Sequence, residues 1–153
     1  MIKTSKGLNL PISGTPDAII SDTPNVTSVS LLANDFVGMK PTMMVKVGDI
    51  VKRGTKLFED KKNPGIFFTS PAGGTVKDIS RGDKRKFLSI EIEITENEEA
   101  ESFHYENTSK GLTNLLINSG LWNAFRTRPF NRTPKVDSAP DAVFVNACDT
   151  NPL

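Results

Sequence analysis

The chain has 153 residues, of which 37% are hydrophobic and 24% charged, and its 19 Lys and Arg residues nearly balance its 18 Asp and Glu residues. This length suits one domain or slightly more, while the hydrophobic content and the near-neutral net charge exclude a disordered chain. No run of about 18 apolar residues exists, which excludes a membrane-spanning helix, and the single Cys148 and single His104 exclude an internal disulfide, a multi-cysteine zinc site and a histidine-rich metal site. We therefore expect a soluble, reduced protein with no catalytic residues and no metal ligands of its own.

Residues 1–25 predict an extended arm, because proline and glycine repeatedly interrupt its short apolar pieces. Residues 26–100 predict a mostly β domain, in which short β-rich segments alternate with turn signals. In the clearest strand, 87–94, the apolar residues at the even positions from 88 to 94 are expected to share one face. Six or seven short strands are expected, over 26–32, 43–47, 50–51, 56–58, 66–69, 75–79 and 87–94. This density of short strands is typical of a small barrel or sandwich.

Residues 101–141 predict an acidic connector, two short helices and a proline-rich link. Leucines near helical spacing predict helices at about 109–118 and 120–126, with Thr108 or Ser109 as the first N-cap. Prolines after the second helix prevent its continuation, so we expect an irregular link up to residue 141.

The last apolar run, 142–147, is unbroken, and such runs suit strands buried on both faces of a parallel sheet. A strand of this kind needs neighbours, but few residues follow it. Residues 142–153 are therefore expected to be the first strand and loop of a second, α/β domain that this sequence does not complete. The fold class expected for the whole chain is α+β: a mostly β barrel, short helices and the opening strand of a truncated α/β domain.

The net charge of +1 conceals blocks of a single sign. Residues 91–106 hold seven glutamates and no Lys or Arg, and a solvated loop is the favoured interpretation. Residues 126–135 hold four basic residues and no acid, interleaved with aromatic and proline residues, which favours a contact surface. Nucleic acid is not an expected partner, because the chain shows no RNA-binding aromatic signature, no helix-turn-helix and no zinc spacing.

Two glycine-containing segments, 45–57 and 70–82, echo each other and resemble the two halves of the biotinyl/lipoyl domain. The resemblance implies a barrel-sandwich hybrid of two interlocking halves. In that family a lysine at an exposed hairpin tip carries biotin or lipoate. Here that position falls near Asn63 and Pro64 rather than on a lysine, so no covalently bound group is expected.

Longer motifs occur in a fixed order along the chain: KGLNLPISG at 6–14, VGMKPTM at 37–43, LFEDKKNPG at 57–65, SGLW at 119–122, RTRPF at 126–130 and DTNPL at 149–153. Together they resemble the NqrA family, whose members belong to the sodium-translocating NADH:quinone oxidoreductase. Because members of that family are considerably longer, the resemblance implies that this sequence corresponds to their N-terminal part.

The resemblance also implies a peripheral member of a complex, at the cytoplasmic face of the bacterial inner membrane. The complex it implies moves electrons from NADH to quinone and exports sodium ions. The implied partners are the other subunits, especially the membrane-embedded ones, and the implied ligand is ubiquinone or menaquinone. Neither FMN nor an iron–sulfur cluster is expected on this part of the chain, so the expected role is structural, without a catalytic centre.

Two clusters are candidate contacts with quinone or with another subunit. The first is Phe36, Met39 and Lys40, and the second is Trp122, Arg126, Arg128 and Phe130. In the first, core packing is the favoured interpretation, and a loop facing quinone or a partner protein is the alternative. In the second, arginine forks and aromatic rings would make good interface anchors, or the walls and polar donors of a quinone site. Packing of the tryptophan on the barrel and capping of helix ends by the arginines is the competing interpretation.

Three single residues and one alternative function complete the predictions. Asp149 and Asn151 would lie in a loop at the carboxyl end of the expected α/β strand, where ligands bind in open α/β sheets. His104 is expected to be exposed and without a catalytic role. The alternative function is a biotinyl/lipoyl-type carrier or adaptor domain of an acyl- or carboxyl-transfer complex.

Overall fold

The computed structural model describes residues 13–14, 17, 19–20, 22, 25–96 and 99–145. Most of the arm expected over 1–25, together with Asp149 and Asn151, lies outside the described residues. In chain order the elements are β1 (Ser28–Leu32), the 3-10 turn η1 (Ala33–Asp35), β2 (Pro41–Met43), β3 (Ile50–Val51), β4 (Lys56–Asp60), β5 (Phe67–Thr69), β6 (Gly74–Arg81), η2 (Asp83–Arg85), β7 (Phe87–Ile94), α1 (Ser109–Asn118) and η3 (Leu121–Ala124).

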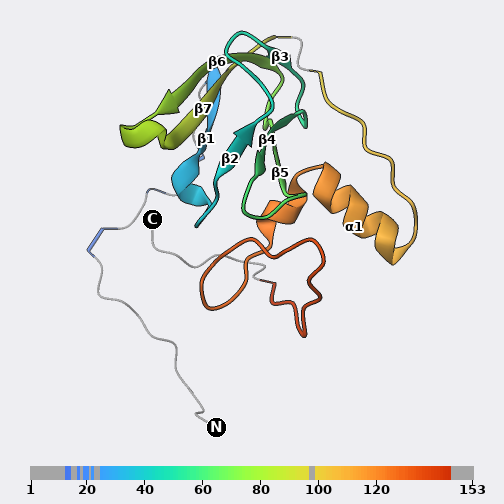
Figure 1. Ribbon diagram of the computed structural model, residues 1–153. Coiled ribbons are helices and arrows are strands. Elements are labelled where there is room, and N and C mark those ends of the chain that lie inside the picture. Colours follow the sequence, from blue (N-terminus) through green and yellow to red (C-terminus); the bar gives the residue numbers. More distant parts are fainter. Residues whose placement is uncertain are drawn as a thin grey trace.

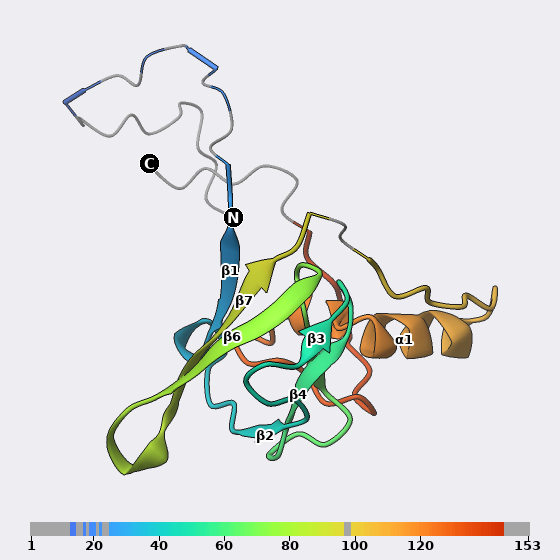
Figure 2. The ribbon, with the colours of Figure 1, turned by 90° about the horizontal axis from the view of Figure 1, so that it is seen from above.

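The strands form two antiparallel sheets (Figure 1). The first has the order β1-β7-β6-β3, and the second has the order β2-β4-β5. The long strands β6 and β7 make a twisted hairpin whose tip projects away from the rest of the molecule (Figure 2). Helix α1 and η3 lie beside β5 (Figure 1). This architecture confirms the expected mostly β barrel-sandwich with short helices, in the α+β class.

The hydrophobic core is built from side chains of both sheets. Phe58 of β4 is fully buried and stacks on Phe68 of β5, with ring centroids 4.6 Å apart and an interplanar angle of 16°. Phe87 of β7 packs against the same Phe58 ring at 5.2 Å in an edge-on arrangement. Aromatic pairs at these separations add to the stabilisation from burial. Phe58 therefore joins the two sheets. The buried members are Val51, Leu57, Phe58, Ile66, Phe68, Val76, Phe87, Ile90 and Ile92.

Strand β7 departs from the expected alternation at its beginning. Leu88 is 44% exposed, whereas Phe87 is only 4% exposed. The pairing of β6 with β7 shifts between Ser80 and Arg81, and such an irregularity changes which side chains share a face. The expectation that Leu88 lies on the same buried face as the isoleucines was therefore wrong, and Phe87 takes its place in the core.

The strand expected over 43–47 lies earlier in the chain, because β2 is Pro41–Met43. Residues after it form a turn in which the amide of Lys46 donates to Oδ2 of Asp49 (2.8 Å) and the amide of Asp49 donates to the carbonyl of Lys46 (3.2 Å). A local bond from an aspartate side chain to the backbone competes with strand pairing. This turn therefore prevents the apolar pattern from extending the strand.

Helix α1 matches the predicted span, and Thr108 is its N-cap, because Thr108 Oγ1 accepts the amide of Gly111 at 2.9 Å. The second helix, expected over 120–126, is reduced to the single 3-10 turn η3. Gly120 separates the two elements with a left-handed backbone (φ +79°), which only glycine adopts without cost. None of the helices in the described part of the chain is long and apolar enough to cross a bilayer.

Substitution of Gly120 by alanine should lower the free energy of unfolding by about 2–3 kcal/mol, because the left-handed backbone costs about 1–2 kcal/mol and the clash adds to it. A Cβ at this position would overlap Oγ1 of Thr69 and lie 3.0 Å from its Cγ2. The matched control is Gly48→Ala, since Gly48 has φ +92° but nothing within 4 Å of the added Cβ. Urea unfolding of both variants checks this, and equal losses would contradict the steric contribution at Thr69.

The strand expected over 142–147 is not formed in its described part, because residues 142–145 have no strand assignment. A strand needs a neighbour to satisfy its amides and carbonyls, and no described strand pairs with these residues. Their apolar side chains are exposed, at 60% for Val143, 78% for Phe144 and 82% for Val145. For the described residues the strand prediction is therefore wrong.

Candidate functional site

The two candidate clusters meet in the structure although they are far apart in the sequence. Phe36 packs edge-on against Phe68 of β5, with ring centroids 4.6 Å apart. The guanidinium of Arg126 lies over the Phe36 ring, 5.5 Å from its centroid, which is within cation–π range. We call this contact between the loop after η1 and the segment after η3 the Phe36–Arg126 junction. It joins one residue of each cluster, although the sequence presents the clusters separately.

Asp60, at the end of β4, fixes the loop that carries the first cluster. Its side chain is buried, and Oδ1 accepts the backbone amides of Lys40 and Lys62, each at 3.0 Å. The carbonyl of Lys40 also accepts the amide of Lys61 at 2.8 Å. Asp60 therefore ties the loop to the β4–β5 turn. Asp60 was not among the residues expected to matter, because an aspartate beside a lysine-rich turn carries no sign of burial in the sequence.

Trp122 and Arg126 are held by bonds within the chain. Trp122 Nε1 donates to the carbonyl of Pro134 at 3.0 Å, and its ring packs against the core. Arg126 Nη1 donates to the carbonyl of Asn123, at the end of η3, and to Oγ1 of Thr133 at 3.2 Å. These contacts are those of packing for Trp122, which is half-buried, and of capping for Arg126, which remains exposed.

The other candidates are more accessible. Phe130 is 71% exposed, and Lys40 and Arg128 are exposed as well. The guanidinium of Arg128 lies 5.3 Å from the centroid of the exposed Phe144 ring. Met39 is half-buried and packs against the core. An incoming partner would therefore meet Lys40, Arg128 and Phe130 first.

Asn123 is a buried residue of this region that the sequence did not single out. It is 9% exposed, and its Nδ2 donates to the carbonyl of Phe67 in β5 at 2.6 Å. Its Oδ1 has no hydrogen-bond partner among the described residues. The bond to Phe67 holds η3 against the smaller sheet and so positions the segment that begins at Phe125.

The β4–β5 turn, where a carrier lysine would have to be exposed, contacts residues 133–136, which we call the C-terminal segment. Nδ2 of Asn63 donates to the carbonyl of Pro134 at 3.2 Å, and the amide of Gly65 donates to Oε1 of Glu59 at 2.7 Å. A Cβ added at Gly65 would lie 3.5 Å from Val136. Asn63 and Gly65 of this turn are therefore half-buried, whereas Lys61, Lys62 and Pro64 remain exposed.

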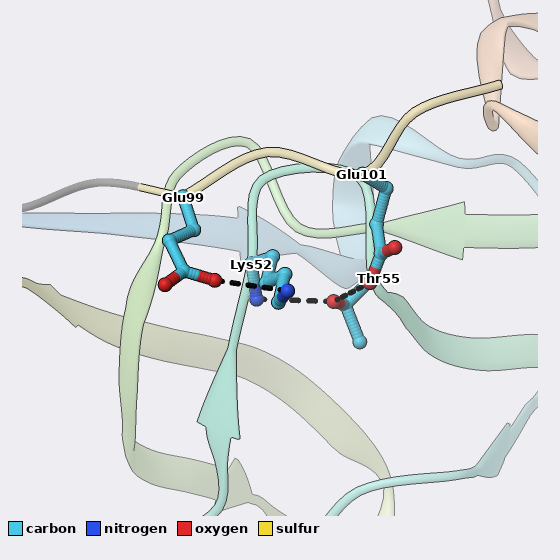
Figure 3. Close-up of polar contacts among 4 residues, drawn as sticks. All are labelled: Lys52, Thr55, Glu99 and Glu101. Atoms are coloured by element: carbon cyan, nitrogen blue, oxygen red, sulfur yellow. Dashed lines mark hydrogen bonds and ion pairs between the residues drawn. The ribbon is translucent and has the colours of Figure 1, made fainter.

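Part of the glutamate-rich connector is pinned to the turn after β3 (Figure 3). Nζ of Lys52 lies 2.9 Å from Oε2 of Glu99, and Oγ1 of Thr55 donates to Oε1 of Glu101 at 3.0 Å. The backbone of Arg53 pairs with this segment through 2.8 Å bonds to Glu99 and Glu101. These glutamate side chains stay exposed, as expected for a solvated loop, but at Glu99 and Glu101 the backbone is held by its pairing with Arg53.

In the exposed Lys52–Glu99 pair, each partner shifts the pKa of the other so that the charged form is favoured. The hydrogen bond from Lys52, with its charge, lowers the pKa of the Glu99 carboxyl, and the same bond raises the pKa of the Lys52 ammonium. The ion pair is therefore fully formed at pH values between about 4.3, the ordinary pKa of a glutamate, and about 10.4, the ordinary pKa of a lysine. It weakens as pH falls through the lowered pKa of Glu99, and as pH rises through the raised pKa of Lys52.

Substitution Glu99→Gln should reduce the hydrogen-exchange protection of the Arg53 and Glu101 amides at neutral pH. The protection that remains should no longer change between neutral pH and pH values below 4, because the titrating partner is gone. NMR-detected exchange measures both effects. Glu106→Gln is the matched control, since Glu106 is exposed and forms no ion pair with any described residue. Equal protection in the two variants would contradict the role of the ion pair.

A hollow of about 540 Å³ lies between this connector and α1. Lys56, Phe103, His104 and Asn118 contribute to its walls, and Nζ of Lys56 donates to Oδ1 of Asn118 at 3.1 Å. His104 is exposed. Within the described residues, no group of three or more His, Cys, Asp or Glu side chains is placed to hold a metal ion.

Comparison with known proteins gives matches along both parts of the chain. Residues 2–95 match the family described as the NqrA N-terminal barrel-sandwich hybrid domain, and residues 107–153 match the NqrA second alpha/beta domain. The NqrA subunit of the Na(+)-translocating NADH-quinone reductase from Neisseria meningitidis serogroup C is 52% identical over 159 aligned positions, covering 100% of this chain and 36% of that protein.

Two further relatives carry the same name. The protein from Neisseria gonorrhoeae strain NCCP11945 is 51% identical, and the protein from Pasteurella multocida strain Pm70 is 52% identical. Each match covers 100% of this chain and 36% of the relative. The chain thus spans about a third of the length of these relatives.

Proposed function

Because the chain belongs to the NqrA family of the Na(+)-translocating NADH-quinone reductase, we propose that it is a docking and quinone-associated part of that complex, at the cytoplasmic face of the bacterial inner membrane. Its partners are then the other subunits, foremost the membrane-embedded ones. In this proposal the chain contributes no redox centre, and the flavins and iron–sulfur cluster belong to other subunits.

The observation that carries the proposal is the Phe36–Arg126 junction with its exposed neighbours. Arginine and aromatic side chains are the groups that most often anchor interfaces. Arg126 and Trp122 are fixed by bonds to the backbone, so the surface is preorganised and binding costs little ordering entropy. Arg128 and Phe130, which follow Arg126 closely in the chain, are exposed.

Ubiquinone or menaquinone suits the same surface. A quinone ring stacks on aromatic side chains, and its carbonyl oxygens accept hydrogen bonds from polar donors. Phe130 offers a ring, and the guanidinium of Arg128 offers donors. The chemistry of this chain toward quinone is therefore positioning, since electron transfer needs a redox group that these side chains do not supply.

The test uses the complex purified from membranes through a tag on the full-length protein. Arg128→Ala combined with Phe130→Ala should reduce the yield of co-purified subunits, or sodium-stimulated NADH:quinone activity, at least tenfold if these residues anchor the contact, about the loss of one hot spot. Tyr105→Ala is the matched control, since Tyr105 is an exposed aromatic residue on the connector.

A photoreactive quinone separates the quinone contact from docking between subunits. The proposal expects crosslinks within 36–43 or 122–130, lost in the double variant even where the complex assembles. Crosslinks confined to other subunits would remove quinone from this chain, while a lone protein that never co-purifies with partners would remove the whole assignment.

The carrier alternative is disfavoured by the contacts of Asn63 in the β4–β5 turn. The position that would carry the prosthetic group lies near Asn63, whose side chain is bonded to the C-terminal segment. Intact-mass measurement of the protein from its own cells tests this directly: a biotinyl or lipoyl adduct would reverse the argument.

A further inference from the structure

A groove of about 500 Å³ lies between the tip of the β6–β7 hairpin and the loop 33–41. Half-buried Phe36 and Met39 and buried Phe87 give it an apolar floor. Its rim carries six cations and no acidic residue: Lys40, Lys62, Arg81, Lys84, Arg85 and Lys86. The groove therefore combines an apolar base with a strongly positive edge.

The rim cations are not neutralised within the described part of the chain. The ion pairs found there join Lys52 with Glu99 and Lys77 with Glu91, and none involves the groove. Of the nearby acids, Asp60 accepts the amides of Lys40 and Lys62 through its Oδ1 and is buried. Asp35 and Asp83 lie on the adjacent turns η1 and η2. Six like charges with two exposed acids beside them create a local field that favours an anion.

Four of these cations, Arg81, Lys84, Arg85 and Lys86, belong to the tip of the β6–β7 hairpin, and this tip projects away from the body of the molecule (Figure 2). Lys84 and Arg85 have left-handed backbones, with φ of +53° and +61°. Lys84, Arg85 and Lys86 are consecutive, so three cations belong to this one turn. Leu88, 44% exposed, lies beside the tip, and Val37, 49% exposed, lies on the opposite wall.

We propose that this groove binds the phosphate headgroups of anionic phospholipids, so that the β6–β7 hairpin rests on a membrane surface. Clusters of four to eight Lys and Arg residues are attracted to anionic lipid, and exposed aliphatic side chains beside them add burial in the interface. A single-stranded nucleic acid would need free aromatic rings for stacking, whereas Phe36 and Phe87 are engaged with Phe68 and Phe58. An acidic peptide would leave Leu88 and Val37 exposed to water.

Flotation of the full-length protein with vesicles tests the proposal. Vesicles of phosphatidylcholine with phosphatidylglycerol should carry the protein at low ionic strength, and vesicles of phosphatidylcholine alone should not. The double variant Lys84→Gln/Lys86→Gln should bind about 25-fold more weakly, because each cation near the surface contributes about fivefold. Lys46→Gln/Lys110→Gln is the matched control, since it removes the same charge from exposed residues outside the groove.

Two further measurements keep the outcome decisive. Thermal unfolding of both double variants checks that the fold is intact, and inorganic phosphate is titrated against the protein without vesicles. Loss of binding in the groove variant alone supports the proposal. Equal loss in the control, equal binding to both kinds of vesicle, or binding of free phosphate or poly-glutamate without binding to vesicles would each overturn it.

Discussion

Substitution of Phe58 by alanine is expected to lower the free energy of unfolding by about 3–5 kcal/mol, the range for a large buried aromatic residue. Phe58 is fully buried and contacts the rings of both Phe68 and Phe87, at 4.6 and 5.2 Å. Its loss leaves a cavity between the sheets that neither neighbour can fill without leaving its own place. Because small domains are stable by only about 5–15 kcal/mol, urea unfolding should show a greatly lowered midpoint.

Phe130→Ala is the control for this substitution, since Phe130 is 71% exposed. It should change the free energy of unfolding by no more than about 0.5 kcal/mol. A loss below about 1 kcal/mol for Phe58→Ala would mean that the two sheets do not share this ring.

Substitution of Asp60 by alanine is expected to cost about 2–4 kcal/mol, because two backbone amides lose an acceptor that is charged. The amides of Lys40 and Lys62 both donate to Asp60 Oδ1. With that oxygen gone, the loop that carries Phe36 keeps only the bond from the Lys61 amide to the Lys40 carbonyl as a tie to the β4–β5 turn. Hydrogen exchange should therefore show lost protection at the Lys40 and Lys62 amides.

Asp60→Asn is the conservative comparison, because its amide oxygen can accept from both backbone amides. It should retain their protection and cost roughly half as much, since hydrogen bonds to a charged group are about twice as strong as neutral ones. If alanine and asparagine have equal effects on exchange at Lys40, the shared acceptor does not organise the loop.

Much of the fold was predictable because it rests on local signals. The alternation of β7, the proline and glycine of the β4–β5 turn and the Thr108 cap each act within a few residues. The predictions failed where contacts between distant parts of the chain determine which residues are buried and which strands pair. The pairing shift near Ser80 changes which residue is buried, and the strand over 142–147 needs partners that an apolar run cannot show.

The candidate site was predictable in its residues but not in its geometry. Aromatic and arginine residues in 122–130 marked a contact surface, yet nothing in the sequence placed Arg126 over Phe36. Asp60 and Asn123 were missed because a polar residue at a turn or in a short helix looks the same whether exposed or buried. The basic groove was missed because its cations come from separate segments of the chain.

The carbonyl of Pro134 accepts hydrogen bonds from both Trp122 and Asn63. One peptide group therefore fastens residues 133–136 both to η3 and to the β4–β5 turn, and a movement of that group would break the two contacts together. Such a segment can detach as a cooperative unit while the barrel stays folded. The proposed contact surface would then have a lifetime shorter than that of the core beneath it, and a bound partner would lengthen that lifetime by mass action.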